Sequence, residues 1–135
     1  MRTPGSGLAL ALALALTGCG AGRAHTLRPA ARSAGATGSF ETKTGDDGNT
    51  RVALKVAHLP RPEALDPSLH TYVLWLRATG EQDWKNMGAL RVNDAREGTL
   101  EVATPYPAFE LQVTAEPDST VAAPGSVVVL AGGPQ

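Results

Sequence analysis

The chain has 135 residues, of which 42% are hydrophobic and 19% charged, with a formal net charge of −1 at pH 7. This composition excludes a disordered polyelectrolyte and a polytopic membrane protein. It also argues against a nucleic-acid binder, which needs a basic surface. The single cysteine excludes a disulfide scaffold and a multi-cysteine zinc site. Apart from the N-terminal segments described next, roughly 100 residues remain, enough for one small domain.

Residues 1–18 have the pattern of a signal peptide. Arg2 provides a positive start, and residues 8–16 alternate leucine with alanine. This run is shorter than the ~20 apolar residues that a membrane-spanning helix needs, but it suits the hydrophobic region of an export signal. It ends in Leu16-Thr17-Gly18-Cys19, which resembles the lipobox of bacterial lipoproteins. The resemblance implies cleavage before Cys19 and acylation of its thiol with fatty acids such as palmitate.

The alternative is an ordinary secretory signal in which Cys19 lies near the cleavage site by chance. The lipid anchor is favoured because a lone free thiol is otherwise a liability in an exported protein. Two or more acyl chains, at about 0.8 kcal/mol per buried CH₂, attach a protein stably to a bilayer. The next residue is Gly20 and not Asp, which in lipoproteins of Gram-negative bacteria favours the outer membrane over the inner membrane.

Residues 19–37 are predicted to be the lipidated cysteine and a flexible basic tether. Arg23, Arg28 and Arg32 give a local charge of +3 without any acid, and Leu27 is the one large aliphatic residue. Such a segment cannot fill a core. Its arginines either attract anionic head groups, at about 1 kcal/mol each, or are common linker filler. From Gly38 onward eight basic residues stand against 13 acidic ones, a net charge of −5, so the tether would hold an acidic body away from an anionic surface.

Residues 38–135 are predicted to form one β-domain. Residues 50–56 and 108–114 alternate apolar with polar side chains, as strands with one buried face do. Residues 72–76 and 127–130 are apolar on both faces, which is typical of strands covered on both sides. Turns rich in Gly, Asn, Asp and Pro separate the segments. We expect an all-β, antiparallel, immunoglobulin-like β-sandwich of about seven strands, at 39–44, 50–58, 70–78, 84–92, 98–103, 108–115 and 126–131, with one helical turn within 62–69.

Alternation along the strands also predicts which side chains form the core. Trp75 is expected to pack on the other face of its strand or under a loop, and Trp84 to cap an end of the sandwich. Alternatively, the two tryptophans form an exposed ligand platform. The expected core residues are Val52, Leu54, Val56, Tyr72, Leu74, Leu76, Leu90, Leu100, Val102, Phe109, Leu111, Val113, Val128 and Leu130.

The order of several short motifs resembles the C-terminal extracytoplasmic domain of anti-sigma-K-type anti-sigma factors. The motifs are Tyr72-Val73-Leu74-Trp75-Leu76, a strand around Met87-Gly88-Ala89-Leu90, the strand end Leu111-Gln112-Val113-Thr114-Ala115-Glu116-Pro117, and Val127-Val128-Val129-Leu130-Ala131-Gly132. The resemblance implies the fold, an extracytoplasmic location and a sensory or interaction role, without catalytic residues. The chain departs from the family at Asp118-Ser119 and Ala123-Pro124-Gly125-Ser126. Only the leader and tether precede the folded part, so sigma-factor inhibition is not carried over.

Two clusters contain residue types that can bind metal ions. His58 and His70, with Asp66 or Glu63, could supply zinc ligands, but the spacing matches no motif, and solvent-facing histidines at strand ends are favoured. Asp46-Asp47-Gly48-Asn49 could bind calcium, but it lacks the regular EF-hand pattern. A hairpin turn is therefore favoured there.

We expect no enzyme, cofactor, metal or nucleic-acid partner. The main hypothesis is a membrane-anchored lipoprotein whose domain is an interaction or assembly module of the cell envelope. Its partners would be the bilayer, through acylated Cys19, and an envelope protein that pairs with an edge or patch near Tyr106, Pro107 and Trp84. The alternative is an extracytoplasmic sensory module that acts with a separate anti-sigma or signalling protein and has a closed pocket. A hydrolase or metal-dependent enzyme ranks behind both.

Overall fold

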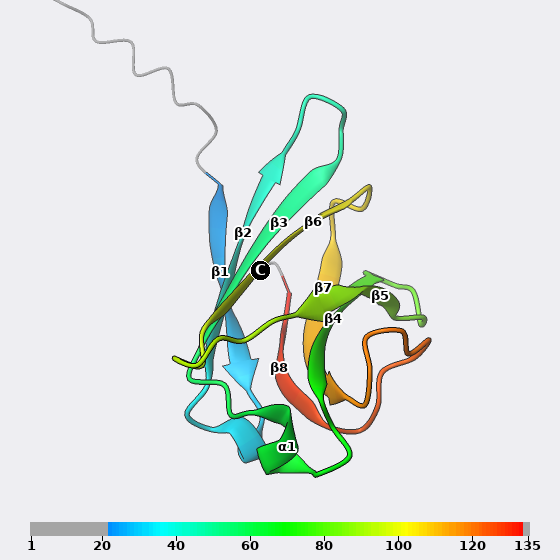
Figure 1. Cartoon of the computed structure of the whole chain (residues 1–135). Coiled ribbons are helices and arrows are strands. Elements are labelled where there is room, and N and C mark those ends of the chain that lie inside the picture. Colours follow the sequence, from blue (N-terminus) through cyan, green and yellow to red (C-terminus); the bar gives the residue numbers. More distant parts are fainter. Residues whose placement is uncertain (1–21, 134–135) are drawn as a thin grey trace, which may run out of the picture.

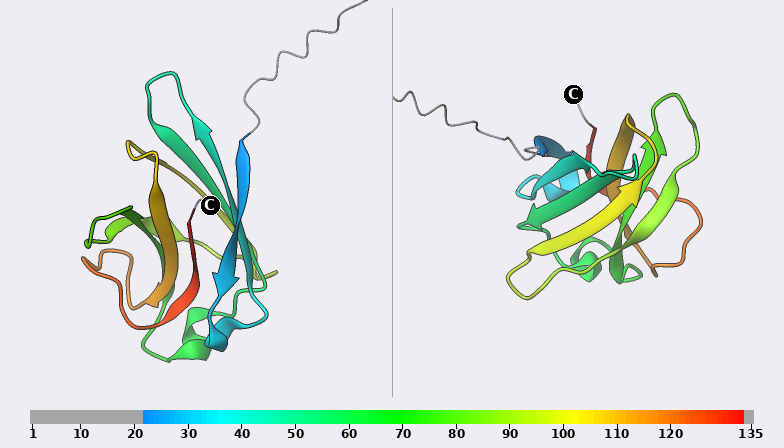
Figure 2. Two further views of the ribbon diagram at one scale, coloured as in Figure 1. Left: turned by 180° about the vertical axis from the view of Figure 1, so that it is seen from behind. Right: turned by 90° about the horizontal axis from the view of Figure 1, so that it is seen from above.

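The computed structural model describes residues 22–133, which form an all-β domain with two short helical turns. Figure 1 shows the strands wrapped around one interior, and Figure 2 shows the same arrangement from behind and from above. The strands are β1 (Arg23–Pro29), β2 (Thr37–Thr44), β3 (Thr50–Ala57), β4 (Thr71–Ala78), β5 (Lys85–Leu90), β6 (Gly98–Thr104), β7 (Phe109–Glu116) and β8 (Val128–Gly132). The turns are a 3₁₀ helix, η1 (Ala31–Ser33), and α1 (Pro62–Leu65).

All the strand pairs are antiparallel, in the order β5-β4-β7-β8-β1-β2-β3-β6. The predicted all-β antiparallel class is therefore confirmed. The strand count is eight in residues 22–133 and not about seven, and the strands form one sheet that nearly closes on itself. The immunoglobulin-like pair of separate sheets is not confirmed, because β1 pairs with β2 along its first part and with β8 at Arg28 and Pro29.

The prediction of a flexible tether up to residue 37 is wrong from Arg23 onward, because this segment contains β1 and η1. Leu27 is 1% exposed and belongs to the core. The His25 ring stacks on Phe40 at a centroid distance of 4.8 Å. The Ser33 hydroxyl donates to the Val129 carbonyl at 2.6 Å. A single buried leucine is enough to keep β1 in the sheet, because β1 forms backbone hydrogen bonds with a strand on each side.

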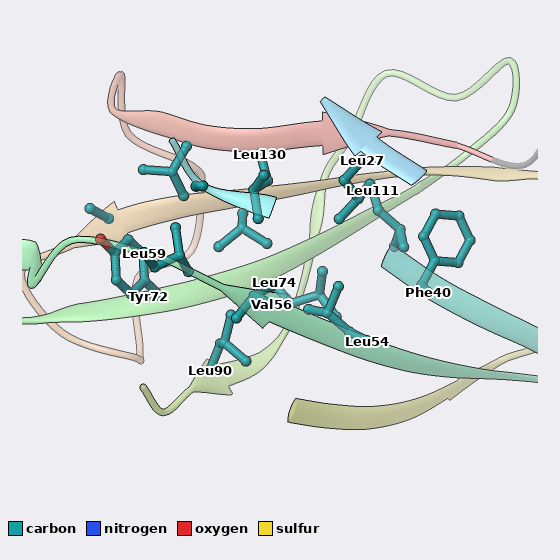
Figure 3. Close-up of a cluster of buried hydrophobic side chains, with 14 of the residues drawn as sticks. Leu27, Phe40, Leu54, Val56, Leu59, Tyr72, Leu74, Leu90, Leu111 and Leu130 are labelled. Carbon is teal, nitrogen blue, oxygen red and sulfur yellow. The ribbon is translucent and has the colours of Figure 1, made fainter. Parts of the chain in front are cut away.

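The core confirms most of the predicted residues, and Figure 3 shows its centre. Leu100 and Val102 are only partly buried, because their strand, β6, lies at an edge of the sheet. In β8, Val129 takes the buried position predicted for Val128. Leu130 is paired with Val113 of β7 and Val128 with the next residue, Thr114, so Val129 between them has no partner on β7. This bulge reverses the alternation on which the prediction rested.

The turns follow from local sequence. Pro62 starts α1, where its missing N–H costs nothing, so the predicted helical turn is confirmed. The Tyr72 hydroxyl, on β4, donates to the Pro60 carbonyl at 2.5 Å and holds the chain just before α1 against the core. Burial raises the pKa of Tyr72 to about 12, and the Glu63 carboxylate contributes to the shift.

Candidate functional site

Trp84 is partly buried and lies between two open grooves. It stands at the end of the β4–β5 connection, immediately before Lys85. The Arg77 guanidinium lies over its ring, with Cζ 4.4 Å from the centroid. Glu110 holds this guanidinium in turn: Arg77 Nε donates to Glu110 Oε2 at 2.9 Å, and a terminal nitrogen donates to the same oxygen. Trp84 is therefore packed against a fixed cation, which is closer to the predicted capping role than to a free platform.

The first hollow, the Tyr106 groove, has a volume of about 520 Å³. Trp84, Tyr106 and Ala122 supply apolar surface, while Glu81 and Asp83 add negative charge. Tyr106 is 44% exposed, and it is the one large hydrophobic side chain among residues 22–133 that is classed as exposed. The structure thus brings together two of the three residues of the predicted patch. The third, Pro107, is exposed but does not line the groove.

The second hollow, the Gln112 groove, lies on the other side of Trp84 and has a volume of about 480 Å³. Arg77, Glu110 and Gln112 give it a polar lining, and the backbone at Gly132 and Gly133 forms part of its wall. A Cβ added at Gly133 would lie 2.8 Å from the Phe109 carbonyl oxygen, so the chain passes close to β7 here. Both grooves are open to solvent, and neither is a closed pocket.

Three connections meet around the Tyr106 groove. The Thr79 amide donates to the Ala108 carbonyl at 3.0 Å and joins the β4–β5 connection to the β6–β7 connection. The Asn86 amide group donates to the carbonyls of Ser119 and Val121 at 2.9 and 3.0 Å, which ties β5 to the β7–β8 connection. Figure 1 shows the β4–β5 and β7–β8 connections, in green and orange, on the same side of the molecule. The groove is thus built from residues far apart in the sequence.

A buried polar chain lies beneath the β7–β8 connection. Trp75 is fully buried, and its indole Nε1 donates to Thr114 Oγ1 at 2.7 Å. The Thr114 hydroxyl donates to Glu116 Oε1 at 2.7 Å, and the Gly125 amide donates to the same oxygen at 2.6 Å. Glu116 is only 3% exposed. The side chain thus fastens the connection over the outer face of β4 and β7, which we call the Glu116 latch.

The latch decides between the predictions for Trp75. Packing on the second face of its strand, under a loop, is confirmed, and the exposed platform of two tryptophans is wrong. Sequence reasoning missed Thr114 and Glu116, because alternation places them on the solvent side of β7. Two features of the sequence could have indicated the latch. The segment from Pro117 to Val127 is long enough to cover a strand face, and Trp75 is a large apolar residue on the outer face of the neighbouring strand.

Of the side chains that could have supplied zinc ligands, only His70 and Glu63 lie close together. His58 and His70 are exposed, one after the end of β3 and the other before β4, which confirms the preferred interpretation. His70 Nδ1 lies 3.5 Å from Glu63 Oε1. Asp66 instead accepts hydrogen bonds from the hydroxyl and amide of Ser68, which lower its pKa. Within residues 22–133, no three His, Cys, Asp or Glu side chains form a group able to hold a metal ion.

The predicted hairpin turn at residues 46–49 is confirmed between β2 and β3. The Gly45 amide donates to the Asn49 carbonyl at 2.8 Å, and Gly48 has a φ of +81° that glycine adopts without strain. The Asn49 amide donates to Asp47 Oδ1 at 3.0 Å and lowers the pKa of that carboxyl. The Asp47 carboxylate therefore stabilises the turn itself by accepting hydrogen bonds from Asn49.

The predicted lipid site lies outside the described residues, as do its motif residues Leu16, Thr17 and Gly18. Among the residues that the structure does describe, no helix has the length and apolarity to cross a membrane. The anti-sigma resemblance stays a prediction based on its motifs, of which Tyr72 to Leu76 lies within β4. No protein-family model, no curated protein and no solved structure matches this chain.

Proposed function

We propose that this protein is a non-enzymatic lipoprotein of the cell envelope, held at the membrane by acylated Cys19. Its β-domain is an interaction module that binds another envelope protein. The sequence Leu16-Thr17-Gly18-Cys19 supports the anchor. The outer membrane is the expected site in a Gram-negative host, because Gly20 follows the cysteine.

The interaction role rests on one observation, the exposed Tyr106 ring beside Trp84. Tyrosine and tryptophan are enriched where proteins bind one another, because they offer large rigid surfaces at a low entropy cost. The Trp84 ring is already held by Arg77 and Glu110, so less order has to be gained on binding. The open form of both grooves favours this role over the sensory alternative, for which we expected a closed pocket.

The anchor is tested by replacing Cys19 with serine. We expect Cys19→Ser to move the protein from the membrane fraction to the soluble envelope fraction, because a serine hydroxyl is not a substrate for thioether lipidation. The mass of the purified native protein gives a second readout, since acyl chains add mass to a chain that starts at residue 19. A Cys19→Ser protein that stays with the membranes would contradict the lipid anchor.

The interaction role is tested by placing a photo-crosslinking amino acid at Tyr106 in living cells. We expect one discrete crosslinked band, whose intensity falls when Trp84 is replaced by alanine. Ala24 is a matched control site, because it is also exposed but lies on β1, away from the groove and from both end strands of the sheet. Equal crosslinking from both sites, or none from Tyr106, would contradict an interaction surface at this groove.

A further inference from the structure

The two end strands of the sheet, β5 and β6, differ in how well they are protected against pairing with a further strand. Within residues 22–133 no ladder joins β5 to β6, and neither strand has a second partner there, so each has a free edge in this part of the chain. The pairing of β5 with β4 is interrupted by a bulge near Gly88, whose φ is +117°, and bulges of this kind prevent further strand pairing. β6 pairs with β3 without interruption from Gly98 to Thr104. β6 is therefore an edge strand of seven residues that no bulge interrupts.

The β5–β6 seam is closed at one end only. A Cβ added at Gly98 would lie 2.5 Å from the Arg91 carbonyl oxygen, so the two strands touch where the 91–97 turn joins them. In Figure 1, β6 runs away from β5 after this turn. At the other end, Lys85 at the start of β5 and Tyr106, two residues after β6, line the Tyr106 groove. The free edge of β6 therefore leads toward that groove.

The side chains of β6 define what could pair with it. Leu100 and Val102 pack against the core but stay partly exposed. Glu101 is exposed on the opposite face and is the only charged residue of the strand. Its direct neighbour on β3 is Ala53, and Ala53 pairs in turn with Glu41 on β2. Glu101 thus has no cation directly opposite it, because the basic residues of β3 on this face, Arg51 and Lys55, stand two positions to either side of Ala53.

We propose that β6 accepts an extended segment of a partner protein as an added strand, with a lysine or arginine of that segment opposite Glu101. Residues on either side of the basic one would be apolar or β-branched, since they face Leu100 and Val102. Main-chain hydrogen bonds to the free edge provide affinity, and the side-chain pattern provides selectivity. The proposal rests on the interaction function proposed above and names the partner's chemistry. A second copy paired through β6 is the less favoured occupant, because β6 has no lysine or arginine to place opposite Glu101 in any register.

The test uses two synthetic seven-residue peptides that differ only at the central position, Thr-Thr-Val-Lys-Val-Thr-Thr and the same peptide with glutamate. Binding to the full chain is measured by fluorescence anisotropy of the labelled peptides. We expect the lysine peptide to bind about fivefold more tightly, and Glu101→Lys to invert the preference, because opposite charges stabilise and like charges destabilise a cross-strand pair. Glu101→Gln should remove the preference. Glu41→Lys is the matched control and should leave it unchanged, because Glu41 is also exposed but lies two strands away.

Hydrogen exchange with bound lysine peptide locates the site. Inverted preference together with new protection of the Gly98–Thr104 amides would support the added strand. Binding without inversion, or protection confined to residues around Trp84 and Tyr106, would overturn it and leave the proposed interaction function intact. Absence of peptide binding would also overturn it, while crosslinking from Tyr106 tests the wider function separately. A dimer in sedimentation analysis that Glu101→Lys dissociates would identify a second copy as the occupant and likewise overturn the proposal.

Discussion

Replacing Glu116 with alanine should open the connection between β7 and β8. The Glu116 carboxylate receives hydrogen bonds from the Thr114 hydroxyl and the Gly125 amide, and Thr114 in turn receives one from the buried indole of Trp75. Alanine removes the acceptor of both donors at once. Gly125 is exposed, so its amide can be hydrated once the connection moves. The Thr114 hydroxyl is fully buried and loses its acceptor inside the fold.

The size of the effect follows from these two donors. A buried donor without an acceptor costs about 1–3 kcal/mol, and the cost lies at the lower end when water reaches it. Glu116→Ala should therefore lower the free energy of unfolding by about 2–4 kcal/mol. This is a large fraction of the roughly 5–15 kcal/mol that stabilises a typical domain. Glu116→Gln keeps a side-chain oxygen acceptor without the charge, so its cost should be about 1 kcal/mol.

The assay combines urea unfolding with tryptophan fluorescence in a Trp84→Phe background, where Trp75 is the only tryptophan. We expect the emission of folded Glu116→Ala to shift to the red, because an opened connection exposes the indole to water. The control is Glu110→Ala on the same strand, whose carboxylate side chain is 50% exposed. It should cost less than about 1 kcal/mol, as exposed ion pairs do. A Glu116→Ala cost below about 0.5 kcal/mol, the range of surface substitutions, with unchanged emission would refute the latch.

Two further predictions concern β1 and the base of β4. Leu27→Ala should cost about 2–5 kcal/mol, as for other fully buried leucines, measured by thermal or urea unfolding. A cost near zero would restore the tether interpretation of this segment. The pKa of Tyr72, raised from an ordinary value of 10.0 to about 12, means that burial favours the neutral phenol. The stability linked to this group is complete below pH 10 and is lost as the pH rises toward 12. Tyr72→Phe should remove that part of the alkaline loss of stability, and an unchanged alkaline unfolding curve would contradict the assignment.

Much of the fold could be predicted because alternation and turn residues are local signals. In β3, and in β7 as far as Val113, every second side chain is buried, and the approximate bounds of both strands follow from that pattern. Strand β1 could not be predicted in this way. Its sequence holds a single large aliphatic residue, and its stability comes from hydrogen bonds to β2 and β8. β2 is the next strand in the chain, but β8 lies at the far end of the domain, and hydrogen bonds to partner strands leave no mark on composition, so composition alone indicated a linker.

In the candidate site, too, local features could be predicted from the sequence and contacts between distant segments could not. The aromatic residues Trp84 and Tyr106 could be singled out because they are large rings with polar or turn-forming neighbours, Asp83 and Lys85 around the one and two prolines around the other. The Glu116 latch could not, since alternation along β7 describes only the two faces of a strand and not a segment that folds back over one of them. The single-residue shift at Val129 likewise depends on the partner strand and has no signature in its own run of valines.

The position of β1 also sets how far the folded body can stand from a bilayer. A free linker from residue 19 to 37 could have extended to about 60 Å, at 3.3–3.6 Å per residue. Because the sheet already begins at Arg23, only four residue steps separate that strand from Cys19, a reach of at most about 14 Å. If Cys19 carries lipid, as we propose, the linker between the lipid and the folded domain is short. The β2–β3 hairpin, which lies beside the start of β1 in Figure 1, would then be among the parts nearest the head groups, and partners would approach from the sides or from the α1 end.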